Sequence, residues 1–233
     1  MKFKSIVVAL MFVATSSFSQ VETFDSLLKK YVTSDGVVDY KGILSEKESL
    51  TSYINYLKNT KPEKTWSANK TKAFWINAYN AYTINLILEN YPISSIMKIK
   101  NGKAWDVKMA EVGGVTYTLN EIEHEQLRAV YKDPRIHVGV NCASFSCPPL
   151  ANFAFTETNV ESELEQLMKR FVNDPKRNVL TPKKVSLSKI FEWYQGDFAT
   201  EGKLIDYIKK YATIELAKQT KVRYLEYNWN LNE

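Results

Sequence analysis

Glycine, cysteine and histidine are scarce in this chain of 233 residues, which holds eight glycines, two cysteines and two histidines. No Gly-rich loop of the kind that cradles phosphate groups is present. A G-x-S-x-G elbow is also missing, so Ser144 and Ser146 do not indicate a serine hydrolase of that type. The two cysteines, Cys142 and Cys147, lack the C-x-x-C spacing of thioredoxin-like proteins, which makes a thiol redox function the weaker hypothesis.

The sequence also lacks the usual marks of a metal protein or a nucleic-acid-binding protein. There is no His-Glu-x-x-His stretch, and His124 and His137 do not have the short paired spacing of zinc ligands. We therefore expect no metal and no cofactor. The formal net charge is +5, but acidic and basic residues are interleaved along the chain. A nucleic-acid partner is not expected, because it would require a clustered basic face.

Apolar runs long enough to span a bilayer are missing as well, since a span takes roughly 20 residues. The start of the chain has a different pattern, with Lys2 and Lys4 before a short apolar run and small residues up to Ser19. This pattern predicts a signal peptide over residues 1–19 and a mature single domain over residues 20–233. We expect an exported protein, periplasmic or secreted, without stable membrane insertion. An oxidising compartment would allow the two cysteines to pair.

Most of the chain has the apolar spacing of amphipathic helices, which predicts helices over residues 21–32, 44–60 and 159–174. A longer helix is expected between an N-cap at Ser67 and Pro92. Its middle is apolar nearly all round, so we expect it at the centre of the core.

The strand signals are fewer. Residues alternate on both sides of Gly113-Gly114, which predicts a β-hairpin. Thr118 or Asn120 would cap a following helix that directs Val130 inward.

Further along the chain, the stretch "RIHVGVN" (135–141) predicts a strand, two short strands flank Pro182, and residues 221–233 predict a closing strand. The sequence therefore predicts one helix-rich α+β domain with a small, mostly antiparallel sheet.

The stretch "HVGVNCASFSCPPL" (137–150) holds both cysteines and one of the two histidines. A thiol nucleophile needs a base within hydrogen-bond reach, roughly 3 Å. An extended chain would separate His137 from Cys142 by about 16 Å and turn the two side chains to opposite faces. This argues against a local pair, although a chain reversal would let His137 approach Cys147.

His124 is the favoured base on the sequence alone. It lies between Glu123 and Glu125, and a neighbouring carboxylate can orient an imidazole and raise its basicity. The two cysteines have an alternative use, since a disulfide between Cys142 and Cys147 would rigidify the turn between them. A bridged pair is not a thiolate nucleophile, so the two interpretations exclude each other.

Asn77 and Asn80 lie three residues apart and share one face of the predicted core helix. A buried amide needs hydrogen-bond partners, because leaving it unpaired costs roughly 1–3 kcal/mol. These side chains therefore either hold the backbone of a neighbouring loop or contact a substrate.

Four stretches together resemble one known family: "AFWINAYNAYTINLILE", "YTLNEIEHEQLR", "DPRIHVGVNCASFSCPPL" and "IFEWYQGDF". From about Tyr40 to near the end, the chain is similar to the domain of unknown function 547 family, in the form of its standalone exported bacterial members. The family's motif positions fall here on Trp75, Asn77, Asn80, Glu123, His124, His137, Cys142, Ser146, Cys147 and Pro148. The resemblance implies no established activity, but such a set of polar and thiol groups favours a functional site over a scaffold.

The first functional hypothesis is a thiol-dependent hydrolase or acyl transferase with a rearranged papain-like layout, in which histidine precedes cysteine. Cys142 or Cys147 would attack a carbonyl, His124 would take the proton, and Glu123 would orient that base. The oxyanion would be stabilised by Asn77 or by backbone amides near Ser146.

Substrate contacts are assigned to Asn77, Asn80, His137 and Ser146. The alternative is a non-catalytic binding module with a loop shaped by a Cys142–Cys147 disulfide. The expected ligand in both cases is a small molecule or a peptide.

Overall fold

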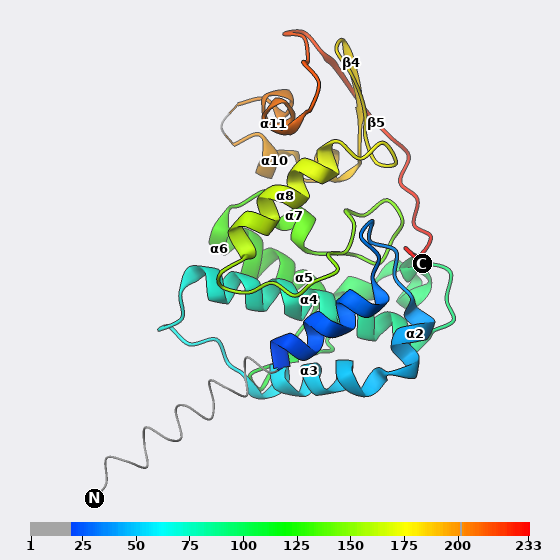
Figure 1. The fold of residues 1–233 in the computed structure, drawn as a ribbon, viewed down its shortest axis with the longest axis vertical. Helices are drawn as coiled ribbons and strands as arrows, with labels where there is room; N and C mark the ends of the chain where they lie inside the picture. The colour runs from blue at the N-terminus through cyan, green and yellow to red at the C-terminus, as the bar shows by residue number, and fades with distance from the viewer. Residues whose placement is uncertain (1–19, 201) are drawn as a thin grey trace, which may run out of the picture.

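The computed structural model describes residues 20–200 and 202–233, so the predicted signal peptide lies outside the described residues. The long helix α4 (Ala68–Asn90) runs through the middle of the molecule (Figure 1). Its N-cap is Ser67, whose hydroxyl accepts a hydrogen bond from the Lys70 amide at 3.1 Å, as predicted. Side chains all round the helix are buried, because other elements cover it on several sides.

The N-terminal elements cover one side of α4. A helix over residues 20–31 is followed by α2 (Tyr40–Ser45) and α3 (Lys47–Asn59), which lie beside α4 in Figure 1. On the other side, α8 (Val160–Val172) packs against both α4 and α7 (Ile136–Gly139). The helices predicted over 21–32, 44–60 and 159–174 are confirmed.

The strands form two small sheets. The predicted hairpin pairs β1 (Ala110–Val112) with β2 (Val115–Tyr117), and both turn glycines have positive φ. In the second sheet, β3 (Val179–Thr181) pairs antiparallel with β4 (Lys184–Leu187), and β4 pairs parallel with β5 (Lys221–Tyr224). The chain is therefore a helix-rich α+β protein whose strands are mostly antiparallel, as the sequence predicts.

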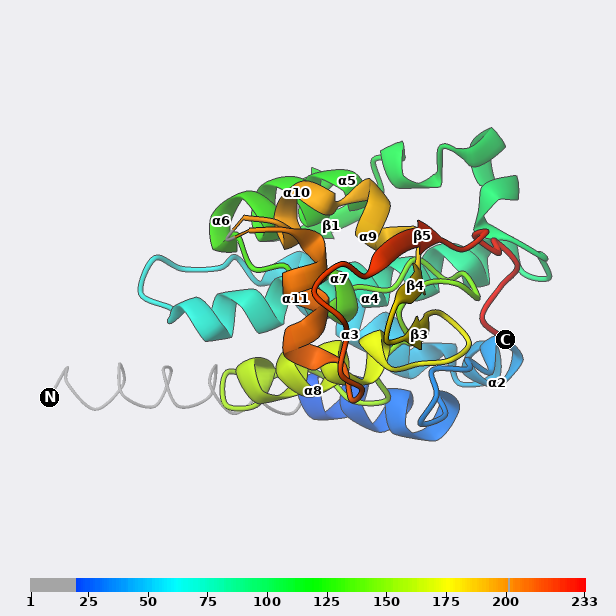
Figure 2. The ribbon, with the colours of Figure 1, turned by 90° about the horizontal axis from the view of Figure 1, so that it is seen from above.

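The remaining elements are short. In Figure 2, which is seen from above, α9, α10 and α11 lie on the face of the molecule that also carries β4 and β5. These remaining elements are η1 (Ile96–Gly102), η2 (Ala104–Asp106), α9 (Ile190–Trp193), α10 (Gln195–Phe198) and α11 (Leu204–Tyr211).

The helical stretch after the hairpin has an unusual middle. Thr118 caps α5 (Leu119–Glu121) in a reciprocal capping box with Glu121, as the first of the two predicted caps. The next segment, η3 (Ile122–Arg128), is a π-helix, and it continues into α6 (Ala129–Tyr131). A π turn holds more residues than an α turn, so later positions lose the α-helical phase. Val130 is therefore 63% exposed, and the prediction that it points inward was wrong.

The strand predicted for "RIHVGVN" was also wrong, because this stretch forms the short helix α7. Asp133 accepts a hydrogen bond from the Arg135 amide at 3.0 Å and Pro134 fixes the backbone before the helix, which favours a helical turn. All four residues of α7 are buried. A short, fully buried apolar run has no period that distinguishes a strand from a helix. Because residues 136–139 are helical, His137 and Cys142 are not separated along an extended strand.

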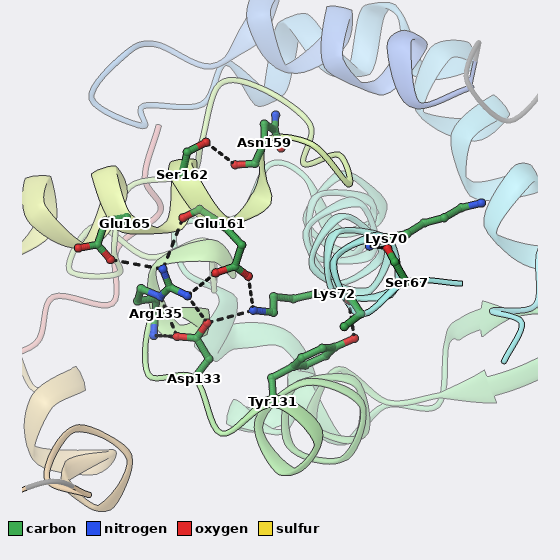
Figure 3. Close-up of polar contacts among 11 residues, drawn as sticks. Ser67, Lys70, Lys72, Tyr131, Asp133, Arg135, Asn159, Glu161, Ser162 and Glu165 are labelled. Atoms are coloured by element: carbon green, nitrogen blue, oxygen red, sulfur yellow. Dashed lines mark hydrogen bonds and ion pairs between the residues drawn. The ribbon is translucent and has the colours of Figure 1, made fainter. Parts of the chain in front are cut away.

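A partly buried network of ion pairs joins α4 and α8 to the segment just before α7 (Figure 3). Lys72 of α4 contacts Asp133 at 3.1 Å and Glu161 of α8 at 2.6 Å. Arg135 binds the same two carboxylates, at 2.8 and 2.6 Å, and reaches Glu165 at 3.3 Å. The side chains of Lys72 and Asp133 are only 7% and 11% exposed. The network thus fixes the segment that leads into α7.

Candidate functional site

A cavity of about 300 Å³ opens beside α7. Four of the residues proposed from the sequence line it: Glu123, His137, Cys142 and Cys147. They come from η3, from α7 and from the loop that follows α7, hereafter the cysteine loop (residues 141–148). Further lining comes from α9, Tyr194, Tyr227 and Trp229, which the sequence analysis did not assign to the site.

Two asparagines shape the start of the cysteine loop. Asn80 of α4 donates to the Gly139 carbonyl at 2.8 Å and accepts from the Asn141 amide at 2.9 Å. Asn141 in turn accepts from the Ala143 amide at 2.8 Å and donates to the Pro148 carbonyl at 2.9 Å. Ala143 has φ +57°, a left-handed conformation that is uncommon for a residue with a side chain and is found most often at functional sites. Both asparagines are buried, so the bend at Cys142 is held from inside the protein.

The rest of the loop is held by a guanidinium and by the C-terminal segment. Arg177, 6% exposed, donates to the Cys147 carbonyl at 2.6 Å and to the Phe145 carbonyl at 3.0 Å. The amides of Phe145 and Ser146 donate to the carbonyls of residues 230 and 228, at 2.7 and 3.2 Å. This pairing places residues 228–231 along the loop and brings Tyr227 and Trp229 to the cavity.

The two cysteines are free thiols with different surroundings. Cys142 is partly exposed, and its sulfur lies 3.2 Å from Ser144 Oγ and 3.3 Å from Tyr227 Oη. Cys147 is buried, and its sulfur accepts from the Cys142 amide at 3.1 Å. Hydrogen bonding from Cys147, followed by that from Ser144 and Tyr227, lowers the pKa of Cys142 to about 7. Burial raises the pKa of the Cys147 thiol well above its usual value.

His137 is held by acidic and aromatic groups. Its Nε2 lies 2.7 Å from Asp197 Oδ2, and its Nδ1 lies 3.9 Å from Glu123 Oε1. The ring of Tyr194 packs against the imidazole with centroids 4.0 Å apart. The hydrogen bond from His137, followed by the bonds from Arg128, lowers the pKa of Asp197 far below its usual range. Asp197 is therefore a carboxylate at neutral pH that fixes the orientation of the imidazole.

His124, the base favoured by the sequence, has contacts different from those of His137. Its Nδ1 is 2.8 Å from Nη1 of Arg128, which binds Asp197 through two nitrogens at 2.7 and 3.0 Å. His124 is not among the residues that line the cavity. Within residues 20–200 and 202–233, neither thiol is hydrogen bonded to an imidazole. The structure thus places His137 at the cavity, whereas His124 contacts Arg128 and lies with its ring centroid 6.4 Å from that of Tyr194.

The other predicted contact residues have protein partners. Asn77 donates to the Phe155 carbonyl at 2.7 Å and accepts from the Phe155 amide at 2.9 Å. Ser146 Oγ accepts from the Asn228 amide at 2.9 Å. With Asn80 bonded as described above, these three side chains hold backbone segments. The loop-holding alternative accounts for the contacts of both asparagines.

Four important residues were missed by the sequence analysis. Tyr194 and Asp197 lie in "IFEWYQGDF", one of the stretches that carry the family resemblance, so a signal for them was present. Arg177 and Tyr227 stand in segments without a recognisable motif, and only the fold brings them to the cysteine loop.

Replacing Asn80 with alanine is expected to lower the free energy of unfolding by about 2–4 kcal/mol, because it leaves the Gly139 carbonyl and the Asn141 amide buried without partners. Urea denaturation followed by circular dichroism measures the change. The matched control is Asn85→Ala on the same helix, where the amide bonds to the exposed Glu89, and a change below about 0.5 kcal/mol is expected there. Equal losses in the two variants would contradict the assigned role of Asn80.

Two further features of the described residues bear on function. No group of three or more histidine, cysteine, aspartate or glutamate side chains in residues 20–200 and 202–233 is placed to hold a metal ion. Over the same residues, none of the helices combines the length and the apolar character needed to cross a bilayer.

Comparison with known proteins gives one match. A family with the description "Protein of unknown function, DUF547" matches residues 63–172. That region includes α4, η3, α7 and the whole cysteine loop, but it ends before Arg177 and Asp197, and it is shorter than the stretch from Tyr40 that the resemblance covered. No curated protein and no solved structure matches the chain. The match over residues 63–172 supports the family that the motifs indicate, the DUF547 proteins, whose function is unknown.

Proposed function

We propose that this protein is a thiol-dependent hydrolase or acyl transferase in which Cys142 is the nucleophile. The observation that carries the proposal is the cavity. It is lined both by the partly exposed Cys142 and by His137, whose imidazole is bound to the Asp197 carboxylate. A thiol with a lowered pKa is a thiolate for much of the time at neutral pH, and the thiolate is the attacking species.

His137 takes the role of acid and base in this proposal, in place of His124. Asp197 occupies its Nε2, which leaves Nδ1 for a group in the cavity. Cys142 Sγ would attack the carbonyl carbon of an ester, thioester or amide, and His137 would give a proton to the leaving group. A water molecule or a second nucleophile then releases the acyl group from the sulfur, returning its proton to the imidazole.

Tyr227 supports the same chemistry. Burial raises the pKa of its hydroxyl well above the usual value, so the hydroxyl keeps its proton and remains a donor. It lies 3.3 Å from Cys142 Sγ and 2.9 Å from Ser144 Oγ. A donor at this place stabilises the thiolate and lies next to the position of the oxyanion that forms on attack. The Asn77 amide and the Ser146 N–H, by contrast, already have backbone acceptors.

The proposal includes export to the periplasm or the medium as a standalone domain, on the strength of the N-terminal sequence pattern. It also includes a rearranged papain-like order, since His137 precedes Cys142. A second candidate is a binding module with a Cys142–Cys147 disulfide, which the 3.1 Å contact between the Cys142 amide and Cys147 Sγ favours by keeping the two residues close.

Alkylation of the native, non-reduced protein by iodoacetamide tests the proposal. Cys142 is expected to react ahead of the buried Cys147, with a rate that rises with pH around a midpoint near 7, where its thiolate forms. Peptide mapping by mass spectrometry at several pH values measures both rates, and Cys142→Ala is the control. A protein in which neither cysteine reacts, and whose intact mass is lower by two hydrogens, would instead be the disulfide-bridged binding module.

A further inference from the structure

One wall of the cavity is aromatic. Trp105, Trp193, Tyr227 and Trp229 all line it. Trp193 and Trp229 stack with centroids 5.8 Å apart and planes 20° apart, while Trp105 meets Trp229 edge-on at 5.8 Å. Tyr227 packs against both, with centroids 4.8 Å from Trp193 and 4.4 Å from Trp229. The residues Trp105, Trp193, Tyr227 and Trp229 are called the aromatic wall below.

Much of this wall is open to solvent. Trp193 is 48% exposed, and Trp105, Tyr227 and Trp229 are partly exposed. Three tryptophans of the five in the chain thus gather at one cavity, although a large indole is normally covered by other side chains. Partly exposed indoles gathered at one cavity favour a ligand that packs against them.

Apart from His137, the charged side chains that line this cavity have one sign. Asp106 and Glu123 line it, and Asp106 is exposed and held at 2.7 Å by the Asn120 amide. The chain has 31 lysines and arginines, yet none of them is among the described residues that line the cavity. The cavity is therefore acidic in a protein of net positive charge, which disfavours an anionic ligand.

The aromatic wall also lacks cations of its own. Elsewhere the protein places cations over aromatic rings, with Lys70 4.3 Å from the centre of the Trp66 ring and Arg128 4.6 Å from that of Tyr194. Within residues 20–200 and 202–233, no lysine or arginine occupies a face of the aromatic wall in this way. Electron-rich faces beside carboxylates are the usual receptor for an ammonium group.

We propose that the cavity binds a ligand with a positively charged amine, which lies on the aromatic wall near Asp106, next to the Cys142 thiol. The inference rests on the proposed function in one respect, since it makes a cationic acyl compound or a cationic acyl acceptor the substrate class. Binding of the cation itself depends only on the wall and the carboxylates.

Choline and its uncharged isostere 3,3-dimethylbutan-1-ol provide the test, because they share their shape and differ in charge. Ligand-detected NMR or calorimetry on the folded Cys142→Ser protein is expected to show choline binding at least about fivefold tighter than the isostere. Trp193→Leu and Asp106→Asn are each expected to remove most of this preference. Trp66→Leu, which removes an indole that does not line the cavity, is the matched control and is expected to keep it.

Equal binding of choline and the isostere, or no binding of choline by the folded protein, would overturn the inference. Retention of the full preference in both Trp193→Leu and Asp106→Asn would overturn it too, since the cation would then bind elsewhere. Because Cys142→Ser lacks the thiol, binding is measured without turnover. A preference for choline in a protein that never forms an acyl-enzyme would refute the proposed function alone.

Discussion

Replacing Cys142 with serine is expected to slow hydrolysis of a small neutral thioester, such as ethyl thioacetate, by about 10³-fold or more. A serine hydroxyl stays protonated at neutral pH, whereas the pKa of the Cys142 thiol is lowered to about 7. The wild-type protein is also expected to gain one acetyl group when it is quenched during turnover. Thiol release followed with a chromogenic disulfide measures the rate, and intact-mass spectrometry locates the acyl group.

Cys147→Ser is the matched control for this prediction, because it also replaces a thiol sulfur with a hydroxyl oxygen, at a position five residues further along the same loop. Cys147 is buried with a raised pKa, so its loss is expected to reduce the rate by less than about tenfold, through the hydrogen bond to the Cys142 amide. If Cys147→Ser were the inactive variant, the two thiols would have exchanged roles. If both variants kept the wild-type rate, thiol catalysis would be excluded.

Replacing Asp133 with alanine is expected to lower the free energy of unfolding by about 3 kcal/mol. The carboxylate lies between Lys72 and Arg135 and also accepts from the Arg135 amide. Its removal leaves the buried Lys72 ammonium with Glu161, which is 43% exposed, and with the Tyr131 ring, whose centre is 5.0 Å away, as its remaining partners. Breaking a buried pair from one side is costly, because the other charge stays in a poorly solvated place. Chemical denaturation at pH 7 measures the loss.

The pKa of Asp133 determines in which direction this loss of stability changes with pH. Burial raises the pKa of Asp133, but hydrogen bonds from Arg135 outweigh burial and the pKa is lowered overall. A lowered pKa stabilises the folded state above the pKa of the unfolded chain, about 4, and this stabilisation is lost as the pH falls below that value. The difference between wild type and Asp133→Ala should therefore shrink on acidification. Asp206→Asn is the control, because Asp206 is 59% exposed and 3.9 Å from Lys209, and a change below about 0.5 kcal/mol is expected.

The fold was predictable where a local signal is strong. The N-cap at Ser67, the glycine pair of the first hairpin and the cap at Thr118 each act through neighbours in sequence, and all three are confirmed. Val130 was misplaced because a π turn changes the helical phase without a change in the apolar pattern. The strand prediction at α7 failed because a fully buried run shows no alternation.

The candidate site was predictable in composition but not in arrangement. The sequence points to Glu123, His137 and both cysteines, and the structure brings these four to one cavity. The choice of His124 over His137 depended on the strand predicted over residues 135–141. This strand does not form, so the choice rested on an incorrect local geometry. The partners of these residues come from segments up to 85 positions away, and no spacing rule connects them.

The pairing of residues 228–231 with the cysteine loop has a consequence for the order of folding. Cys142 and its hydroxyl donor Tyr227 are 85 positions apart, so they meet only after nearly the whole domain has been synthesised. Contacts of such large separation form late, because a long loop must close first. A nascent or truncated chain that ends before residue 220 therefore carries Cys142 but lacks Tyr227 and Trp229, which are half of the aromatic wall. We expect the reactivity of the Cys142 thiol to report on completion of the fold.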